Sequence, residues 1–519
     1  MPTYSQTGRL LAVTTPLGAD KLLLERLRSE EALSEPFRLS LEVLCKRADA
    51  FDFDKLLGQA VTAKVMLPDG SFRFHNGVVA EVEETDEKQG AQGQELLRYK
   101  LEVVPKLFLL SLNKKSRIFQ QLSVTDILKQ VLTGFDVSWQ TQGTYEPRDF
   151  CTQYRESDFA FASRLMEEEG IWYCFKHADG SHTMVVGDAP SAHAAVPGPA
   201  TVSFQPGQGG AHPDDRIMRW SRKQAMRPGK ATLWDQCFEL PGQNLEAAQP
   251  VLATVAAGTK THKLDAGGNS AIELYEYPGL YAQRFDGTAP GGGDRASDVQ
   301  KIFQDNARTA KLRMEEATSR AVAIEGAGNV RHLCAGHTFT LKDHFNADGE
   351  YVLTRTRLEA SIIGAYEGSG QADEKVEGSF ECVPKALPFR PARKTPRPVI
   401  AGPQTAVVTG PSGQEIFTDK YGRIKVQFPW DREGKKDAAS ACWVRVGTPW
   451  AGKQWGMIHI PRIGQEVVVA FEDGDPDRPL AVGSVYNAEN MPPYALPDNM
   501  TQSGMKSRST KQGGADDFN

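Results

Sequence analysis

Apolar and polar residues alternate with a period of two along much of the first hundred residues. Residues 37–43 read FRLSLEV, and residues 61–67 show a similar pattern before a Pro-Asp-Gly turn. Such alternation places one face of a strand against a core and the other in solvent. The pattern therefore predicts β-strands joined by hairpins.

Three segments follow the helical period instead. Ser123 precedes an apolar stripe that stops at Gly134, which predicts a short capped helix. A second helix is expected over 157–169, with the acidic run Glu167–Glu169 as a solvated last turn. The third and longest is expected to begin at Ser297, which would cap it, and to continue towards residue 319.

The last third of the chain changes character at a stretch rich in proline and basic residues. Residues 384–398 hold five prolines and five lysines or arginines, which favours a semi-rigid linker over a polybasic binding site. The next ninety residues contain five or six short strand patterns and no competing helix, as in a small barrel of the OB type. Residues 491–519 lose almost all periodicity.

Composition and charge narrow the class of protein. The chain has 519 residues, 24% of them charged and 40% hydrophobic, with a net charge of -6. We expect three or four globular domains, no transmembrane helix and no global positive charge for wrapping nucleic acid. Seven scattered cysteines suit reduced thiols, and the N-terminus lacks the pattern of a signal peptide, so cytoplasmic synthesis is expected.

Motifs for catalysis and cofactor binding are missing from the sequence. It contains no P-loop, no HExxH and no GxSxG. The best metal candidate is His332, Cys334, His337 and His344, whose spacing matches no zinc pattern, so ordinary strand and loop residues are favoured. We therefore expect no catalytic residue, no metal and no cofactor, and a protein that is not an enzyme.

Four of the eight tryptophans, at 430, 443, 450 and 455, fall in the barrel segment. Exposed tryptophans could stack on bases or sugars, whereas buried ones would fill a core or a subunit interface. Packing is the favoured interpretation.

A series of motifs resembles a known family. They are GRIKVQFPWDREG at 422–434, CWVRV at 442–446, IPRIGQEVVV at 460–469 and GDPDRP at 474–479, with QYRESDF at 153–159, EGIWY at 169–173 and TQSGMKSR at 501–508. In order and spacing this series resembles the VgrG spike proteins of type VI secretion systems, which are similar to phage tail hub and needle proteins.

The resemblance implies a mainly β fold with some α. Residues 1–385 would form a hub of two related barrel-like domains with helical insertions, 386–398 a basic linker, 399–487 an OB-fold neck, and 488–519 the start of a β-helical needle cut short in this sequence. It also implies a homotrimer whose six similar hub domains seat on a hexameric Hcp tube. A PAAR tip protein and effectors would be carried through the missing needle, which crosses target membranes only in passing.

Candidate residues for neck packing or the trimer interface follow from these motifs. They are Trp430, Asp431, Trp443, Arg445, Trp455, Arg462 and Glu466. Two other functions stay open. One is an OB-fold protein that binds oligosaccharides or single-stranded nucleic acid, and the other is a cell-wall hydrolase, for which the short path from neck to residue 519 leaves no room for a lysozyme domain.

Overall fold

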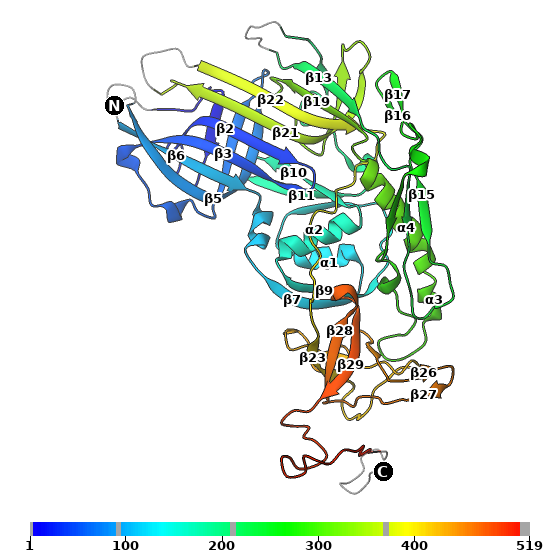
Figure 1. Cartoon of the computed structure of the whole chain (residues 1–519). Coiled ribbons are helices and arrows are strands. Elements are labelled where there is room, and N and C mark those ends of the chain that lie inside the picture. The colour runs from blue at the N-terminus through cyan, green and yellow to red at the C-terminus, as the bar shows by residue number, and fades with distance from the viewer. Residues whose placement is uncertain (1–3, 90–94, 208–213, 367–372, 509–519) are drawn as a thin grey trace.

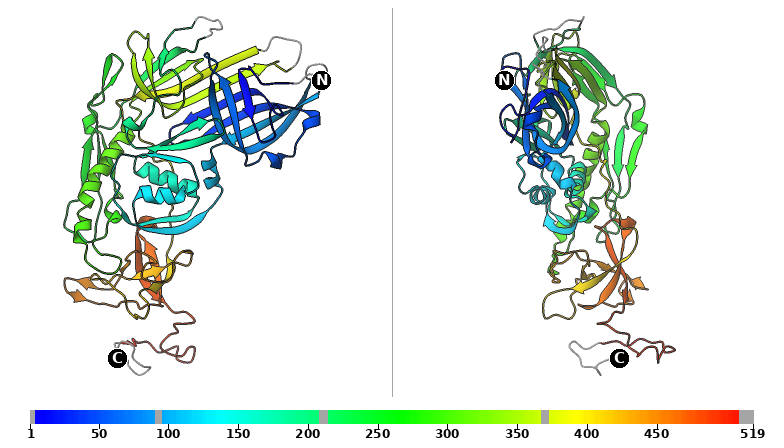
Figure 2. Two further views of the ribbon diagram at one scale, coloured as in Figure 1. Left: turned by 180° about the vertical axis from the view of Figure 1, so that it is seen from behind. Right: turned by 90° about the vertical axis from the view of Figure 1, so that its left-hand side faces the viewer.

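The computed structural model describes residues 4–89, 95–207, 214–366 and 373–508 (Figure 1). Most regular structure is β, as the alternation predicts. We call the described residues within 4–385 the hub and residues 399–487 the neck. The hub lies at one end of the molecule, the neck lies below it, and the C-terminal segment lies beyond the neck (Figures 1 and 2).

The first half of the hub holds six strands in the spatial order β1-β4-β5-β6-β3-β2. Their bounds are β1 Leu11–Thr14, β2 Leu23–Ala32, β3 Glu35–Lys46, β4 Ala60–Met66, β5 Phe72–Gln89 and β6 Glu95–Val104. In β3 the apolar positions Phe37, Leu39, Leu41 and Val43 are all buried. The expected two-faced strand is confirmed there.

The second half holds six strands in the matching order β12-β20-β21-β22-β19-β13. They are β12 Thr201–Ser203, β13 Ile217–Gln224, β19 Val322–Gly328, β20 Thr338–Lys342, β21 Gly349–Ile363 and β22 Asp373–Pro384. An antiparallel seam between β2 and β21 joins both halves into one twelve-stranded sheet. The two six-stranded halves of the hub are thus continuous in one sheet.

A helical subdomain lies between the halves. It contains β7 Lys115–Leu122, α1 Val124–Val131, β8 Val137–Gln140, β9 Arg148–Glu156, α2 Asp158–Glu168, β10 Trp172–Ala178 and β11 Ser181–Gly187. The Ser123 hydroxyl accepts from the Asp126 N–H at 3.2 Å, and Ser157 caps α2 in the same way. Both short helices begin where their caps predict.

A second insertion separates β13 from β19. It contains β14 Lys230–Leu233, β15 Ala247–Pro250, β16 Thr254–Ala257, β17 Lys260–Lys263, β18 Glu273–Glu276, α3 Ala296–Val299 and α4 Ile302–Thr318. The expectation of one helix capped by Ser297 is wrong. Gln300 and Lys301 donate to carbonyls three residues back, which tightens the backbone and splits α3 from α4.

The neck is built from short strands. β24 Lys425–Gln427, β23 Gln404–Thr409, β28 Glu466–Phe471, β29 Pro479–Val485 and β25 Arg445–Val446 form a five-stranded sheet in that order. β26 Ala451–Gly452 and β27 Trp455–Gly456 form a separate hairpin, which projects to one side in Figure 1.

Short 3₁₀ turns complete the described elements. They are η1 Arg47–Asp49, η2 Phe53–Lys55, η4 Lys106–Ser111, η5 Pro190–Ala192, η6 Asn269–Ala271, η7 Ala282–Arg284 and η8 Glu472–Gly474. Residues 488–508 contain no strand, although a needle start is expected there, and a single chain offers no neighbouring strands for a β-helix to wind against. Residues 509–519 lie outside the described residues. Among the described helices, none has the length and apolarity needed to cross a bilayer.

Candidate functional site

The four residues weighed as metal ligands do not converge. His332 places Nε2 3.0 Å from the Pro199 carbonyl, and His337 places Nδ1 3.1 Å from the Ala335 carbonyl. Cys334 is buried in the apolar core of the second half, and His344 stacks on Phe345. No metal-binding group of three or more His, Cys, Asp or Glu occurs in the described part of the chain.

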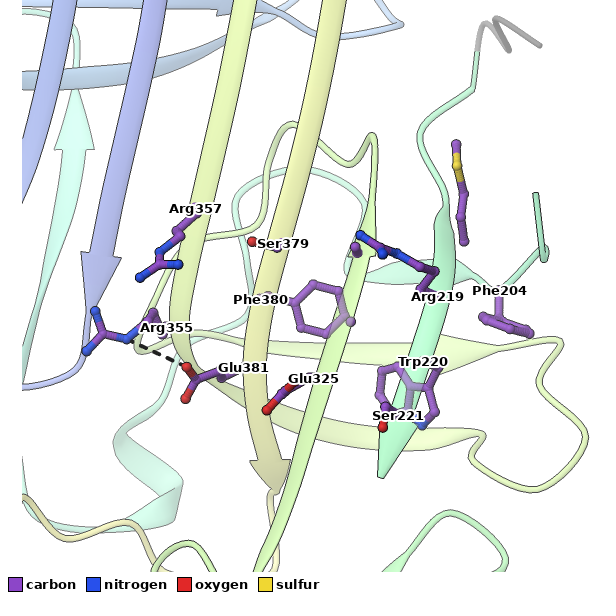
Figure 3. Close-up of a pocket in the computed structure, with 13 residues that line it drawn as sticks. Phe204, Arg219, Trp220, Ser221, Glu325, Arg355, Arg357, Ser379, Phe380 and Glu381 are labelled. Carbon is purple, nitrogen blue, oxygen red and sulfur yellow. Dashed lines mark ion pairs between the residues drawn. The ribbon is translucent and has the colours of Figure 1, made fainter. Parts of the chain in front are cut away.

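A groove of about 680 Å³ lies along β13, β19, β22 and β21 (Figure 3). Three arginines and two glutamates line it, and Arg355 pairs with Glu381 at 3.8 Å. Among the described residues of the lining, Ser221 and Ser379 carry the hydroxyls, and no histidine lies there to act as a base on them. The lining therefore carries three positive and two negative side chains.

The most elaborate chemistry lies where the neck meets the hub. Trp430 stacks on Phe428 with ring centroids 5.1 Å apart and meets the edge of Tyr154 from β9 at 5.3 Å. Its indole N–H donates to Gln404 at 2.8 Å, and Gln404 donates in turn to the Tyr154 hydroxyl at 2.8 Å. One aromatic cluster therefore includes residues from both parts.

Trp443 makes a second contact between neck and hub. Its side chain is 5% exposed, and its indole N–H donates to the carbonyl of Ala289 in a hub loop at 2.9 Å. The Lys425 ammonium lies 5.2 Å from the ring centroid. Burial together with a satisfied N–H is the usual state of a packing tryptophan.

Arg423 joins the same loop region by charge. The buried guanidinium donates to Asp419 of the neck at 2.6 Å and to both carboxylate oxygens of Asp286 in the hub at 2.7 and 2.9 Å. Burial alone would lower the pKa of Arg423, but these two carboxylates raise it. The bidentate contact with Asp286 fixes the orientation of the Arg423 guanidinium as well as compensating its charge.

The basic linker also binds the hub. Arg390 pairs with Glu315 at 2.7 Å, and Arg393 pairs with Glu316 at 3.0 Å. Arg397 bridges hub and neck, because it contacts Glu168 at 3.1 Å and Asp475 at 3.1 Å. The segment connects two domains, yet its cations are held in place along the hub rather than free in solvent.

The expectation that Glu167–Glu169 form a solvated last turn is wrong. Glu167, Glu168 and Glu169 are each at most 6% exposed. Glu168 contacts Arg148 at 3.0 Å and Arg397 at 3.1 Å, and Glu169 contacts Arg284 at 3.4 Å. Burial alone would raise the pKa of Glu168, but the surrounding arginines outweigh it and hold that pKa far below its usual range. Glu168 and Glu169 are buried because arginines from distant parts of the chain compensate their charges, whereas Glu167 accepts hydrogen bonds from Thr395.

A cavity of about 250 Å³ lies in this junction, lined by carboxylates from both parts. Burial raises the pKa of Glu239 to about 7, with the neighbouring Asp286 adding to the shift. Burial likewise raises the pKa of Asp149 and of Asp477 to about 6, each beside a second carboxylate. The junction therefore contains both paired ions and carboxyl groups that resist ionisation.

Comparisons with known proteins bear on the hub and neck together. Residues 30–362 match the family model of the phage tail baseplate hub (GPD), and residues 414–486 match the type VI secretion system/phage-baseplate injector OB domain. The spike proteins VgrG1b, VgrG1c and VgrG1a of Pseudomonas aeruginosa are 38%, 39% and 39% identical to this chain, each over 99% of it. The chain belongs to the VgrG spike family.

This VgrG chain spans 65%, 67% and 75% of the lengths of those three relatives. Among solved structures, a component of the E. coli type VI secretion system described as similar to the T4 tail proteins gp27 and gp5 aligns with a TM-score of 0.59. It is 18% identical and covers 92% of this chain and 99% of its own. The lidded Francisella PdpA-VgrG complex aligns with a TM-score of 0.56 at 9% identity, covering 93% of this chain and 69% of that one. These two likenesses show the fold.

The remaining predicted residues of the VgrG neck have separate local roles. Asp431 accepts from the N–H groups of Glu433 and Gly434 at 3.1 Å and so closes a turn. Arg445 is exposed, with its guanidinium 4.9 Å from the ring centroid of Phe238 in the hub.

Two further candidates lie on the side of the neck that leads to the C-terminal segment. Arg462 pairs with Glu415, and Glu466 accepts from the Asn487 amide at 2.9 Å, which lowers the pKa of Glu466.

The last candidate, Trp455, is 59% exposed and meets Trp450 edge to face at 5.2 Å. Trp430, Trp443 and Arg445 thus meet the hub, whereas Trp455 does not.

Sequence reasoning missed Arg423, Arg397, Glu168 and Asp477. Arg423 lies inside the motif at 422–434 and Asp477 inside the motif at 474–479, so these motifs could have pointed to both residues. Arg397 and Glu168 are 229 residues apart, and no local pattern connects them.

Proposed function

We propose that this chain forms the hub and neck of a structural, non-enzymatic spike of the type VI secretion system. It assembles as a homotrimer, seats on the hexameric Hcp tube and helps puncture target membranes as effectors are delivered. The observation that carries the proposal is the repeat of six strands in the two hub halves. Three chains present six similar halves, which suits a hexameric partner.

The clamped junction supports a mechanical role. A spike driven forward must transmit load from hub to neck without bending at the connection. Here aromatic packing, the Trp443 hydrogen bond and the bridge formed by Arg397 hold the neck against the hub at several points. Buried ion pairs resist separation of neck and hub, because removing one partner leaves an uncompensated buried charge.

The neck hairpin supports a trimer contact. Trp450, Trp455 and Ile458 are 61%, 59% and 80% exposed around β26 and β27. Large aromatic residues dominate the energetics of many interfaces, and a cluster of them in solvent marks an interaction surface. We assign this surface to a second copy of the chain. Trp455 is then the predicted interface residue that acts between chains, and the other six candidates act within one chain.

Tip and cargo partners belong to the same proposal. A PAAR tip protein and effectors would bind beyond the neck, and export through the type VI system into target cells would replace a signal-peptide route. Two observations on related proteins support this part. The Pseudomonas aeruginosa relatives are spike proteins of the type VI secretion system, and the Francisella structure with the same fold is a complex of PdpA with VgrG.

The binding-protein and hydrolase alternatives are not favoured. An oligosaccharide or single-strand binder needs exposed aromatic rings on its barrel. Trp443 is buried in the junction and Trp430 stacks on Phe428, while the exposed rings of Trp450 and Trp455 lie on the hairpin that we assign to a second copy. Fluorescence quenching by added oligomers and turnover of cell-wall substrate are the two measurements that would revive these alternatives.

Light scattering across protein concentration tests the proposal. A homotrimer has a mass of 171 kDa, three times the chain mass of 57.0 kDa. We expect that species at micromolar concentration, together with binding to purified Hcp rings. A mass of 57.0 kDa at every concentration would contradict the trimer.

A further inference from the structure

The wall of the junction cavity contains two carboxyl groups that hydrogen-bond to each other. Glu239 and Asp286 both come from loops of the second hub insertion, and their side chains share a hydrogen bond. Two carboxylate ions can only accept hydrogen bonds, so a hydrogen bond between them requires a proton on one of the two. The pair therefore holds one proton in the arrangement that the structure shows.

Hub backbone and a neck side chain hold the Glu239 carboxyl in place. Its Oε1 accepts from the Gly287 N–H at 3.0 Å, and its Oε2 lies 3.5 Å from the hydroxyl of Tyr421 in the neck. A Cβ atom at position 287 would lie 2.4 Å from Oε2, so glycine is needed there for the carboxyl to fit. Glu239 thus lies between a hub loop and the neck.

Arg423 of the neck compensates the other member of the pair. It donates to both carboxylate oxygens of Asp286 at 2.7 and 2.9 Å and to Asp419 at 2.6 Å. Its guanidinium also lies 5.0 Å from the ring centroid of Phe238 and 5.3 Å from that of Tyr421. Arg423 is therefore already bound to two carboxylates before Glu239 ionises.

Asp149 of β9 and Lys425 of β24 also face Asp286. The Lys425 ammonium donates to the Ala441 carbonyl at 2.8 Å. Four carboxyl groups, Asp149, Glu239, Asp286 and Asp419, thus meet two cations, Arg423 and Lys425, at this contact. Ionisation of all four would leave net negative charge in a buried place, where charge is costly.

Three further titratable groups face the pair, the thiols of Cys237 and Cys442 and the phenol of Tyr421. Burial raises the pKa of each, so all three are neutral near pH 7. They do not change the charge at the contact as the pH passes through neutrality.

The remaining charged groups of the cavity wall come from the neck. Arg478 pairs with Glu472 at 2.7 Å, and Asp477 lies 3.6 Å from Arg397 of the linker. Arg445 is exposed, so solvent screens its charge. The state of the carboxyl pair therefore has a large influence on the charge between hub and neck.

We propose that the proton shared by Glu239 and Asp286 makes the docking of the neck on the hub sensitive to pH. With the proton in place, the pair is joined by a hydrogen bond and carries one negative charge, which Arg423 compensates. Without it, two like charges lie in contact beside an arginine that Asp419 also uses. Loss of the proton then favours an open junction, in which water reaches both carboxylates.

The sign of the effect follows from the pKa of Glu239. Burial raises this pKa from 4.5 to about 7 in the docked state. The stability that the docked state gains from this group is fully present below pH 4.5 and is lost as the pH rises to about 7. Within that range the equilibrium constant for opening the junction rises by up to about tenfold per pH unit.

Glu239→Gln tests the proposal, because an amide can accept from Gly287 and donate to Asp286 at every pH. Hydrogen exchange in the 289–294 loop, where Ala289 accepts from Trp443, reports opening of the junction after correction for the intrinsic pH dependence of exchange. From pH 5 to pH 7 the wild-type opening constant should rise about tenfold or more relative to that of the variant.

Glu246→Gln is the matched control, because it makes the same substitution at an exposed position of the same insertion. It should follow the wild type. Amides of β3 in the hub core report global unfolding, and their protection should stay the same in all three proteins. Parallel curves for the wild type and Glu239→Gln overturn the proposal, as does an equal rise in exchange in β3 and in the loop.

Infrared absorption of protonated carboxyl groups provides a second measurement. Between pH 6 and pH 8 the wild type should lose one more protonated carboxyl than Glu239→Gln, and circular dichroism shows whether the variant is folded. A wild type in which no carboxyl loses its proton over this range overturns the proposal whatever the variant does. None of these outcomes bears on the trimer, which light scattering measures separately.

Discussion

At the scale of single residues, one arginine links three parts of the molecule. Arg397 from the linker contacts Glu168 of α2 and Asp475 of the neck, and it is 3.6 Å from Asp477. Removing a partner from a buried ion pair costs more than the pair contributes net, because the remaining charge stays desolvated. Glu168 keeps Arg148 as a partner at 3.0 Å, which limits the loss.

Arg397→Ala is therefore expected to lower the free energy of unfolding by about 2 kcal/mol. Lys394→Ala is the matched control, because Lys394 lies three residues away and its pair with Glu35 has side chains 57% and 33% exposed. That control should change stability by less than about 0.5 kcal/mol. Urea unfolding measures both, and equal effects would contradict a special role for Arg397.

The raised pKa of Asp477 leads us to expect that the free energy of unfolding depends on pH. Its pKa of about 6 lies above the ordinary value of 3.8, so its ionised form is disfavoured in the folded chain. Arg397 and Arg164 face it and favour the ion, while burial and Asp475 disfavour it. Stability from this group is then present at low pH and is lost as pH rises from about 4 to about 6.

Asp477→Asn removes this loss while its side-chain oxygen can still accept from the Thr152 N–H, which is 2.7 Å from Asp477. Relative to the wild type, the variant should gain up to about 3 kcal/mol between pH 4 and pH 7. Asp54→Asn, an exposed position, is the control. Parallel curves of unfolding free energy against pH for Asp477→Asn and the wild type would refute the assignment.

At the scale of elements, the neck is stabilised partly by its contact with the hub. Trp443 fills that contact, with Phe417 at 4.9 Å on the neck side and Ala289 accepting its N–H on the hub side. Trp443→Ala should cost about 3–5 kcal/mol and increase hydrogen exchange in the 289–294 loop. Trp443→Phe keeps most of the ring but loses the hydrogen bond, so about 1 kcal/mol is expected. Slow exchange in that loop in both variants would mean that Trp443 serves the neck core alone.

Local elements of the fold could be predicted from the sequence, whereas contacts between distant elements could not. Caps at Ser123 and Ser157 and the alternation in β3 are local, and each is found where expected. The burial of Glu168 depends on Arg397, 229 residues away, which no window of sequence contains. The break between α3 and α4 is local, but the apolar pattern continues through it and gives no sign of it. The family motifs lie within the segment that matches the OB domain, yet they could not show that Trp443 meets the hub and Trp455 does not.

At the scale of the whole molecule, the exposed hairpin of the neck is the surface that we assign to a second copy of the chain. Trp455 is 59% exposed in one chain, so truncating it should leave the unfolding of a single chain nearly unchanged. If the hairpin lies against a second copy, Trp455→Ala should lower the trimer association constant about thirtyfold or more, the loss typical of a hot-spot residue. Met226→Ala is the matched control, since Met226 is 60% exposed on the hub. Sedimentation across concentration separates the two, and a Trp455→Ala trimer as stable as the control would mean that the hairpin takes no part in the contact between chains.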